Sequence, residues 1–378
     1  MKTIHTENTG HKNNFDFVRC MLAISVIFTH GFVVYTGKID IEPFWRLSRH
    51  QVGLGTISLN FFFVISGYLV LQSWTYSKGV FDFLKKRVLR IYPGFIVVCI
   101  LCAFIFAPLG NGTLISPFSD FFSYWKKINL HVLIYDVLQL FPPALPETLV
   151  NSPCPNDINT SIWTIWYEFV CYLVILVAGS LMFFKKQIIP LVLFLLILGL
   201  NIYHFRIYQL YNEEGAIKLI FPLLSEDANE KIINMEHFLL FFLSGSCFYF
   251  YRKYIPKNNP LIILSTIILI VSFRWIRVFE LCQAIFGTYL LLCFVFSSKI
   301  KLNNFAKRGD FSYGIYLYGW PVQQLVFLYF GSRLNIGATI IISLLLVFPF
   351  AFFSWFAIEK PCLSLKKRTF LQLKKAKA

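Results

Sequence analysis

The stretch that decides the fold is FDFVRCMLAISVIFTHGFVVY, residues 15–35. It is almost entirely apolar, and about 20 such residues suffice for an α-helix to cross a bilayer. Two residues in it are ill suited to lipid, Arg19 and His30. They are eleven residues apart, so at ~100° and ~1.5 Å per residue they share one helix face and lie about 16 Å apart along the axis. Because an unpaired ionisable residue is costly in a membrane, the pair predicts a polar path through the protein. The alternative is that Arg19 only reaches the headgroups and His30 only hydrogen-bonds a neighbouring helix.

The composition predicts an all-α, polytopic membrane protein. Of the 378 residues, 57% are hydrophobic and 14% are charged, and Phe alone contributes 43, which is far from the average of soluble domains. The first apolar run is too long for a signal peptide and no small-residue cleavage site follows it, so we expect it to remain as an anchor. The net charge of +16 points to the membrane surface rather than to nucleic acid.

Ten membrane-spanning helices are predicted, with both termini in the cytoplasm. With this topology 24 of the 35 Lys and Arg fall on the cytoplasmic side and 11 on the other, which agrees with the positive-inside rule. The predicted domains are a cytoplasmic tail (1–15), a ten-helix transmembrane domain (16–358) and a basic tail facing anionic lipid (359–378). The predicted spans are residues 16–36, 56–75, 92–109, 162–184, 188–204, 236–251, 260–276, 280–297, 311–330 and 336–358.

Three connections between spans stand out. The outer connection 110–161 contains five prolines between Pro142 and Pro155, so we expect an extended, lid-like loop. The outer connection 205–235 is acidic, and the inner connection 76–91 is strongly basic.

The basic connection carries two arginines that suit phosphate. Arg87 and Arg90 are three residues apart, so on a helix they would be neighbours on one face. A pair of guanidinium groups fits a pyrophosphate or a nucleotide phosphate. We assign Tyr92, which follows them, to the same site. The alternative is that the arginines only fix the orientation of the protein in the membrane.

Glu168 is predicted to lie at the depth of His30. It stands about seven residues, or ~10 Å, inside the outer end of its span, and His30 stands about six residues, or ~9 Å, inside the outer end of the first. A carboxylate beside an imidazole would fix its tautomer and stabilise the imidazolium. The alternative is an isolated glutamate facing an outer vestibule. Cys99 and Cys102 have CxxC spacing but no second pair or nearby His, so we expect no metal site.

Six segments between residues 15 and 361 carry a resemblance to a known family: FDFVR with His30, FFFVISGYL, RVLRIYP, SIWTIWYEF, SYGIYLYGWP and IEKP. In this order they resemble the integral-membrane acyltransferase-3 family, the O-antigen and peptidoglycan O-acetylase type. The resemblance covers essentially the whole transmembrane part. It departs from many members at Asn60, where they carry Asp, and at Trp320, where they carry His.

The resemblance implies transfer of an acyl group, usually acetyl, from cytoplasmic acyl-CoA to a hydroxyl of an extracytoplasmic glycan, in the bacterial inner membrane. It implies that His30 is catalytic and that Arg19, Arg87 and Arg90 are needed for activity. We expect the arginines to hold the phosphates of acetyl-CoA. The pantetheine arm, roughly 15–20 Å long, would then span the ~16 Å to His30.

Two chemistries at His30 stay open: a general base, with Glu168 orienting the imidazole, or an acyl-imidazole intermediate. The acceptor is equally open among O-antigen (lipopolysaccharide), capsule, exopolysaccharide and peptidoglycan. A transporter or flippase of a lipid-linked or anionic substrate is the alternative function, because polar residues in a helix bundle suit it too. A pseudoenzyme that organises glycan synthesis is a third.

Overall fold

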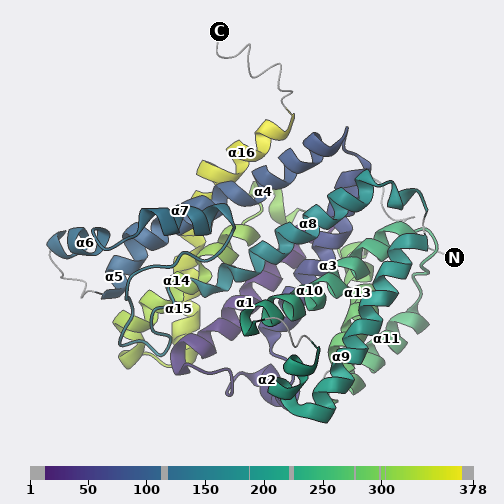
Figure 1. Cartoon of the computed structure of the whole chain (residues 1–378), viewed down its shortest axis with the longest axis horizontal. Helices are drawn as coiled ribbons and strands as arrows, with labels where there is room; N and C mark the ends of the chain where they lie inside the picture. The colour runs from purple at the N-terminus through teal and green to yellow at the C-terminus, as the bar shows by residue number, and fades with distance from the viewer. Residues whose placement is uncertain are drawn as a thin grey trace, which may run out of the picture.

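The computed structural model describes residues 13–111, 118–186, 188–220, 225–275, 278–297, 299–302 and 304–367. These residues form helices and loops, with no strand among them. The longer helices pack side by side in one bundle (Figure 1). Within the described part, seven helical stretches are long and apolar enough to cross a membrane, which confirms the predicted polytopic helical bundle. These stretches are Phe15–Thr36, Leu54–Thr75, Val80–Asn111, Thr160–Ser180, Ala228–Tyr251, Val278–Val295 and Ile336–Ser364.

The α-helices are α1 (Phe15–Thr36), α2 (Pro43–Leu47), α3 (Leu54–Thr75), α4 (Val80–Leu101), α5 (Ala107–Asn111), α6 (Phe118–Trp125), α7 (Leu130–Leu138), α8 (Thr164–Ser180), α9 (Ile188–Ile220), α10 (Glu226–Tyr251), α11 (Asn259–Ser272), α12 (Val278–Cys282), α13 (Thr288–Val295), α14 (Ser312–Phe330), α15 (Ile336–Phe353) and α16 (Lys360–Ser364). Three π-helical segments continue α-helices: η1 (Cys102–Phe106), η4 (Gln283–Gly287) and η7 (Ser354–Glu359). Short 3₁₀ segments are η2 (Thr160–Trp163), η3 (Phe183–Lys185), η5 (Phe305–Arg308), η6 (Gly331–Arg333) and η8 (Leu365–Lys367).

Helix α14 lies at the centre of the bundle, since every residue from 312 to 324 is buried. It packs on α1 and α15. Helices α1 and α14 run parallel, because their contacts advance together along both: Arg19 pairs with Asp310, just ahead of α14, and the Ile27 carbonyl accepts from Gln323 at 2.8 Å. Side chains at one end of α1 therefore meet the beginning of α14.

Helices α3 and α10 cross at backbone contact. A Cβ atom at Gly67 would overlap the Phe242 carbonyl, and one at Gly245 would overlap the Val64 carbonyl. Small residues at such a crossing let two membrane helices approach closely. Gly67 and Gly245 therefore permit the close packing of α3 on α10.

The prediction that residues 76–91 form a connection before the third span is wrong, because most of this basic segment is helical. Helix α4 already begins at Val80, and with η1 and α5 it continues to Asn111. Lys86 pairs with Asp82 at 2.7 Å, one turn apart on the same helix, so charged residues that lower the hydropathy still fit a helical backbone.

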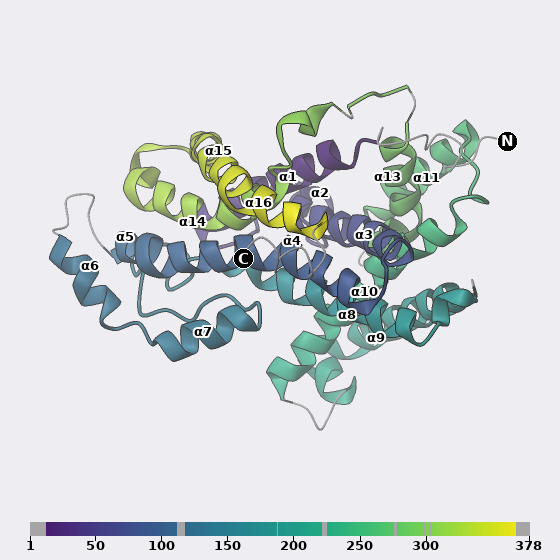
Figure 2. The same ribbon diagram turned by 90° about the horizontal axis from the view of Figure 1, so that it is seen from above.

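The two predicted outer loops contain helices, although residues 139–159, which carry the five prolines, form an extended connection without a helix. Residues 110–161 contain α6 and α7, which lie at one edge of the molecule in both views (Figures 1 and 2). Helix α9 continues beyond the predicted end of its span, residue 204, to Ile220. Among the predicted spans, 188–204 and 260–276 coincide with shorter apolar helices, and 311–330 coincides with the buried α14. The total of ten spans and the side of each terminus stay predictions.

Candidate functional site

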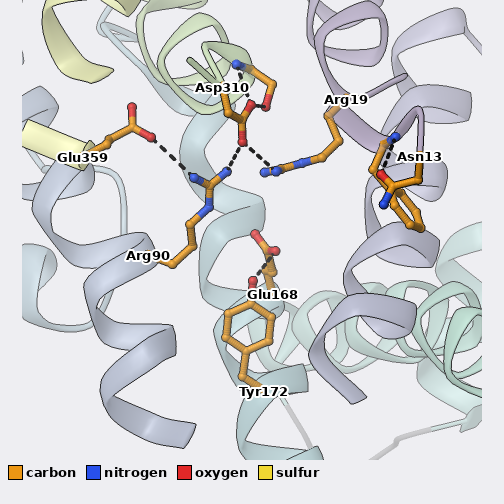
Figure 3. A network of polar contacts seen from close by, with 9 residues as sticks. Asn13, Arg19, Arg90, Glu168, Tyr172, Asp310 and Glu359 are labelled. Carbon is orange, nitrogen blue, oxygen red and sulfur yellow. Dashed lines mark hydrogen bonds and ion pairs between the residues drawn. The ribbon is translucent and has the colours of Figure 1, made fainter. Parts of the chain in front are cut away.

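Two arginines from different helices converge on one carboxylate oxygen. Arg19 of α1 donates to Oδ2 of Asp310 at 2.7 Å, and Arg90 of α4 donates to the same oxygen at 2.9 Å (Figure 3). A second carboxylate, Glu359 at the end of η7, lies 3.6 Å from Arg90. We call Arg19, Arg90, Asp310 and Glu359 the arginine cluster. It joins four segments that are far apart in the sequence.

Local backbone geometry places Asp310. The preceding Gly309 has φ of 146°, where a side chain is strained, and a Cβ there would overlap the Trp355 indole. Oδ1 of Asp310 accepts from the backbone N–H of Ser312 at 3.2 Å and from its hydroxyl at 2.5 Å. One carboxylate oxygen therefore holds the start of α14 while the other holds both arginines.

The charge state of Asp310 follows from these neighbours. Burial by itself would raise the pKa of the Asp310 carboxyl, but Arg19 and Arg90 together outweigh it and hold that pKa well below its usual range. Asp310 is thus a fixed negative charge between two fixed positive charges.

A cavity of about 120 Å³ opens beside the cluster. Both arginines line it, with Glu168 and Tyr172 of α8 along one wall. Its lining residues on α3 run from Leu59 to Val70, eleven residues or ~16 Å of helix. We call it cavity one. Its end away from the arginine cluster is lined by Tyr316 of α14 and Leu59 of α3.

Glu168 belongs to cavity one and not to His30. Its Oε1 accepts from the Ser66 hydroxyl at 2.8 Å and from the Tyr172 hydroxyl at 2.5 Å. No hydrogen bond or ion pair joins Glu168 to His30, both of which the structure describes. The prediction of a direct His–carboxylate pair is therefore not met in this arrangement.

His30 lies just beyond cavity one. Its ring packs edge-on against the Trp320 indole, with 4.8 Å between centroids. Trp320 is one helical turn after Tyr316 on α14, and its Nε1 donates to the carbonyl of Asp157 at 3.0 Å. The parallel α1 and α14 thus carry the arginine cluster at one level and the His30–Trp320 contact about three turns farther along.

A family model described as an acyltransferase domain matches residues 12–359, nearly the whole chain. The chain belongs to this acyltransferase family. An O-acetyl transferase of Shigella phage Sf6 is 26% identical over 367 residues, which cover 93% of this chain and 96% of the relative. Nodulation protein 10 of Rhizobium leguminosarum bv. viciae is 25% identical over 166 residues, 44% of each chain. No solved structure matches. Family and helices together make it a multi-pass membrane acyltransferase.

Arg87 is near cavity one but does not line it. Its Nη2 donates to the Ser73 hydroxyl at 3.0 Å, and its guanidinium lies 5.5 Å from the centre of the Tyr172 ring. Its Nε is buried without an acceptor among the described residues. Through Tyr172, Arg87 is connected to Glu168 rather than to the arginine cluster.

Tyr92 is directed elsewhere. Its hydroxyl donates to the Leu138 carbonyl at the end of α7, and its ring packs edge-on against Phe169. The structure thus brings Arg19 and Arg90 together, keeps Arg87 close, and separates Tyr92 from all three. Among the described residues, no group of three or more His, Cys, Asp or Glu could hold a metal ion.

Sequence reasoning missed Asp310 and the role of Glu359. Glu359 stands inside the quoted segment IEKP, and Asp310 stands two residues before the quoted segment SYGIYLYGWP. The available signal was their charge, since acidic residues at the ends of apolar spans need partners. A search for acidic residues at span ends that could pair with Arg19 and Arg90 would have identified Asp310 as a candidate.

Proposed function

We propose that this acyltransferase moves an acetyl group from acetyl-CoA to a hydroxyl of a surface glycan, with the donor in cavity one. The observation that carries the proposal is the length and polarity of this cavity. It begins at two guanidinium groups and continues for ~16 Å between apolar and aromatic walls, and it ends one helical turn short of His30.

The arginine cluster suits the phosphates of CoA. Arg19 uses only Nη1 for Asp310, so its other N–H groups are available to a ligand in the cavity it lines. The carboxylates hold the guanidinium groups in place, and a pre-oriented fork loses less freedom when it binds phosphate. Arg87, with its unpartnered Nε, supplies a third cation behind Tyr172.

The walls of cavity one suit the rest of the donor. Phe62, Phe63 and Leu69 provide apolar surface for the pantetheine arm and exclude water from the thioester. Glu168 faces this space, where its carboxylate can accept from an amide N–H of the arm while it orders Tyr172. We therefore propose a donor-positioning role for Glu168 in place of direct contact with His30.

His30 acts as the general base in this proposal. It takes the proton of the acceptor hydroxyl, whose oxygen attacks the thioester carbonyl; the C–S bond breaks, and the CoA thiolate recovers the proton from the imidazolium. Trp320 fixes the ring by edge-on packing. The other chemistry, acetyl transfer first to the imidazole nitrogen, uses the same placement.

The test separates binding from chemistry. Purified protein in lipid nanodiscs is measured for [14C]acetyl-CoA binding, and cells are measured for O-acetylation of surface polysaccharide by mass spectrometry. His30→Gln is expected to retain binding and to lose transfer by ~10²–10⁴-fold. His131→Gln, an exposed histidine on α7, is the matched control and should behave like wild type. Near-normal acetylation by His30→Gln would overturn the assignment of His30 as the catalytic residue. If wild-type protein does not bind acetyl-CoA, the proposal that acetyl-CoA is the donor would be overturned.

A further inference from the structure

A second, larger cavity lies on the other side of Leu59. Its volume is about 570 Å³, within the roughly 300–1,000 Å³ of ordinary small-molecule sites. Leu59 lines this cavity and cavity one alike. We call it cavity two, and its wall carries Trp45, Gln51, Trp163, His204, Glu236 and Glu280.

Cavity two reaches the depth of His30. Thr56 lines it, and the neighbouring Gly55 donates its N–H to the Thr29 hydroxyl at 2.8 Å, which puts this part of α3 beside His30 of α1. A molecule in cavity two would therefore approach the His30 level from the side opposite the arginine cluster.

Hydrogen bonds and one longer ion-pair contact position the polar groups of cavity two. Glu236 lies 2.8 Å from Nδ1 of His204. His237 has Nε2 at 2.8 Å from the Asn60 side-chain oxygen and Nδ1 at 3.9 Å from Glu280. These contacts hold two carboxylates at the cavity wall, and each carboxylate has oxygen lone pairs to spare for a ligand.

Gln51 offers a further unused acceptor. Its Nε2 donates to the Phe273 carbonyl at 2.6 Å, which fixes the amide plane. Its Oε1 is buried and has no hydrogen-bond partner among the described residues. A buried acceptor without a partner is costly, and a hydroxyl of a ligand in this cavity would satisfy it.

The chemistry of this wall selects a class of ligand. Two carboxylates and an amide oxygen accept hydrogen bonds, and Trp45 and Trp163 offer flat apolar faces that suit the C–H face of a pyranose ring. No Lys or Arg occurs among the described residues that line the cavity. The Glu280 carboxylate at this wall repels an anion, so a uronic acid or a phosphate is disfavoured here.

We infer that cavity two binds the acceptor, and that the part of the acceptor it holds is a neutral or amino sugar without an anionic group. The inference rests on the proposed transfer to a glycan and names its acceptor class. Leu59 then separates the thioester in cavity one from the sugar in cavity two until both are bound.

The experiment compares the binding of sugars with and without an anionic group to the full chain in nanodiscs. Surface polysaccharide from cells that express the chain natively is de-O-acetylated, cut to oligosaccharides and split by anion exchange into a neutral-plus-amino fraction and an acidic fraction. Binding of each fraction is measured by equilibrium dialysis without acetyl-CoA, and labelling is then measured with [14C]acetyl-CoA. Trp45→Ala and Glu280→Gln test the cavity, and Glu147→Gln, an exposed glutamate that lines neither cavity, is the control.

The expected result is at least about tenfold tighter binding of the neutral-plus-amino fraction, which also carries the label. Trp45→Ala should weaken that binding without changing acetyl-CoA binding. Glu280→Gln should reduce the difference in affinity between the neutral-plus-amino fraction and the acidic fraction. Equal or tighter binding of the acidic fraction, or cavity variants that match Glu147→Gln, would overturn the inference. Binding without any labelling would overturn the proposed transfer and leave cavity two as a sugar-binding site only. No binding of either fraction, with labelling of the polysaccharide intact in cells, would overturn the inference alone.

Discussion

Arg19 and Asp310 form an ion pair of 2.7 Å across 291 residues of sequence. The same Asp310 oxygen also receives Arg90, so one carboxylate orders the guanidinium groups of two helices. The side chains of Arg19 and Asp310 are 20% and 12% exposed, which places the pair between surface and interior. Breaking such a pair leaves a partly buried charge without its partner.

Asp310→Asn should therefore destabilise the protein, by up to about 3–5 kcal/mol if the pair behaves as a buried one. Acetyl transfer should fall at least tenfold, because both guanidinium groups lose their orientation. Asp82→Asn, which removes the more exposed pair with Lys86 (22% and 27% exposed), is the matched control and should cost about 0–1 kcal/mol. Thermal unfolding and transfer assays report the two effects. Tighter acetyl-CoA binding with unchanged transfer would mean instead that Asp310 competes with the donor for the arginines.

The substitution Arg90→Lys keeps the positive charge but removes the planar guanidinium group with its two separate N–H directions. A lysine is a point charge and cannot hold Asp310 and Glu359 with two separate N–H directions as Arg90 does. We expect acetyl-CoA binding at least tenfold weaker, and steeper salt dependence, as measured by isothermal titration calorimetry. Arg46→Lys, whose arginine is exposed in α2 and bonded to the Asp40 carbonyl, controls for the change of residue type. Unaltered affinity in Arg90→Lys would remove Arg90 from the donor site.

The charge state of Lys366 should make the binding of acetyl-CoA depend on pH. Burial, and then the nearby cations Arg87, Arg90, Lys86 and Arg19, lower the pKa of Lys366 to about 7. Below this pH the ammonium is charged and attracts the phosphates of the donor; above it the attraction is lost. Acetyl-CoA affinity should thus fall about threefold to tenfold as pH rises through 7, with proton uptake on binding above pH 7.

Lys366→Met should flatten this step, and Lys360→Gln should preserve it. Lys360 is exposed and lies over the Phe356 ring, outside the cation group around Lys366. Titration calorimetry between pH 6 and 8, in buffers of different ionisation enthalpy, measures affinity and proton uptake together. A step of the same size in Lys366→Met would assign the titration to another group.

Leu59 should limit unproductive hydrolysis. Its side chain lines both cavities, so Leu59→Ala would connect the water of cavity two with the thioester in cavity one. We expect acetyl-CoA hydrolysis without acceptor to rise several-fold, while acetyl-CoA binding stays within about twofold. Release of free CoA thiol is the measurement, with Leu47→Ala, an exposed leucine of α2, as control. Hydrolysis at the wild-type rate in Leu59→Ala would show that the cavities are closed from each other by other groups.

The bounds of long apolar helices could be predicted well from the sequence, whereas the bounds of helices that contain charged residues could not. Helix α1 was expected at 16–36 and occupies Phe15–Thr36, because apolar composition alone fixes it. Helix α4 was expected to begin at residue 92 and begins at Val80, since its lysines and arginines reduce the hydropathy although they favour a helix. Helices α6 and α7 were missed because neighbouring prolines suggested an extended chain.

The candidate site was predictable along each helix but not between helices. Spacing within α1 correctly relates Arg19 to His30, because both belong to one rigid repeat. Equal depth did not make Glu168 a partner of His30, since depth leaves the direction around each helix axis undetermined. Glu168 instead turns toward Ser66 and Tyr172. The pairing of Arg19 with Asp310 depends on how two distant helices pack, which no local pattern encodes.

The π-helical turn η7 has a consequence for how relatives should be aligned. Ser354–Glu359 carries one residue more per turn than an α-helix would, and Glu359 at its end reaches Arg90 while Ser354 donates to the same carboxylate at 2.9 Å. Deleting one residue inside this turn would rotate everything after it by ~100° about the helix axis. A homologue with a one-residue gap here would therefore present a different side chain to Arg90 even if its IEKP letters were unchanged.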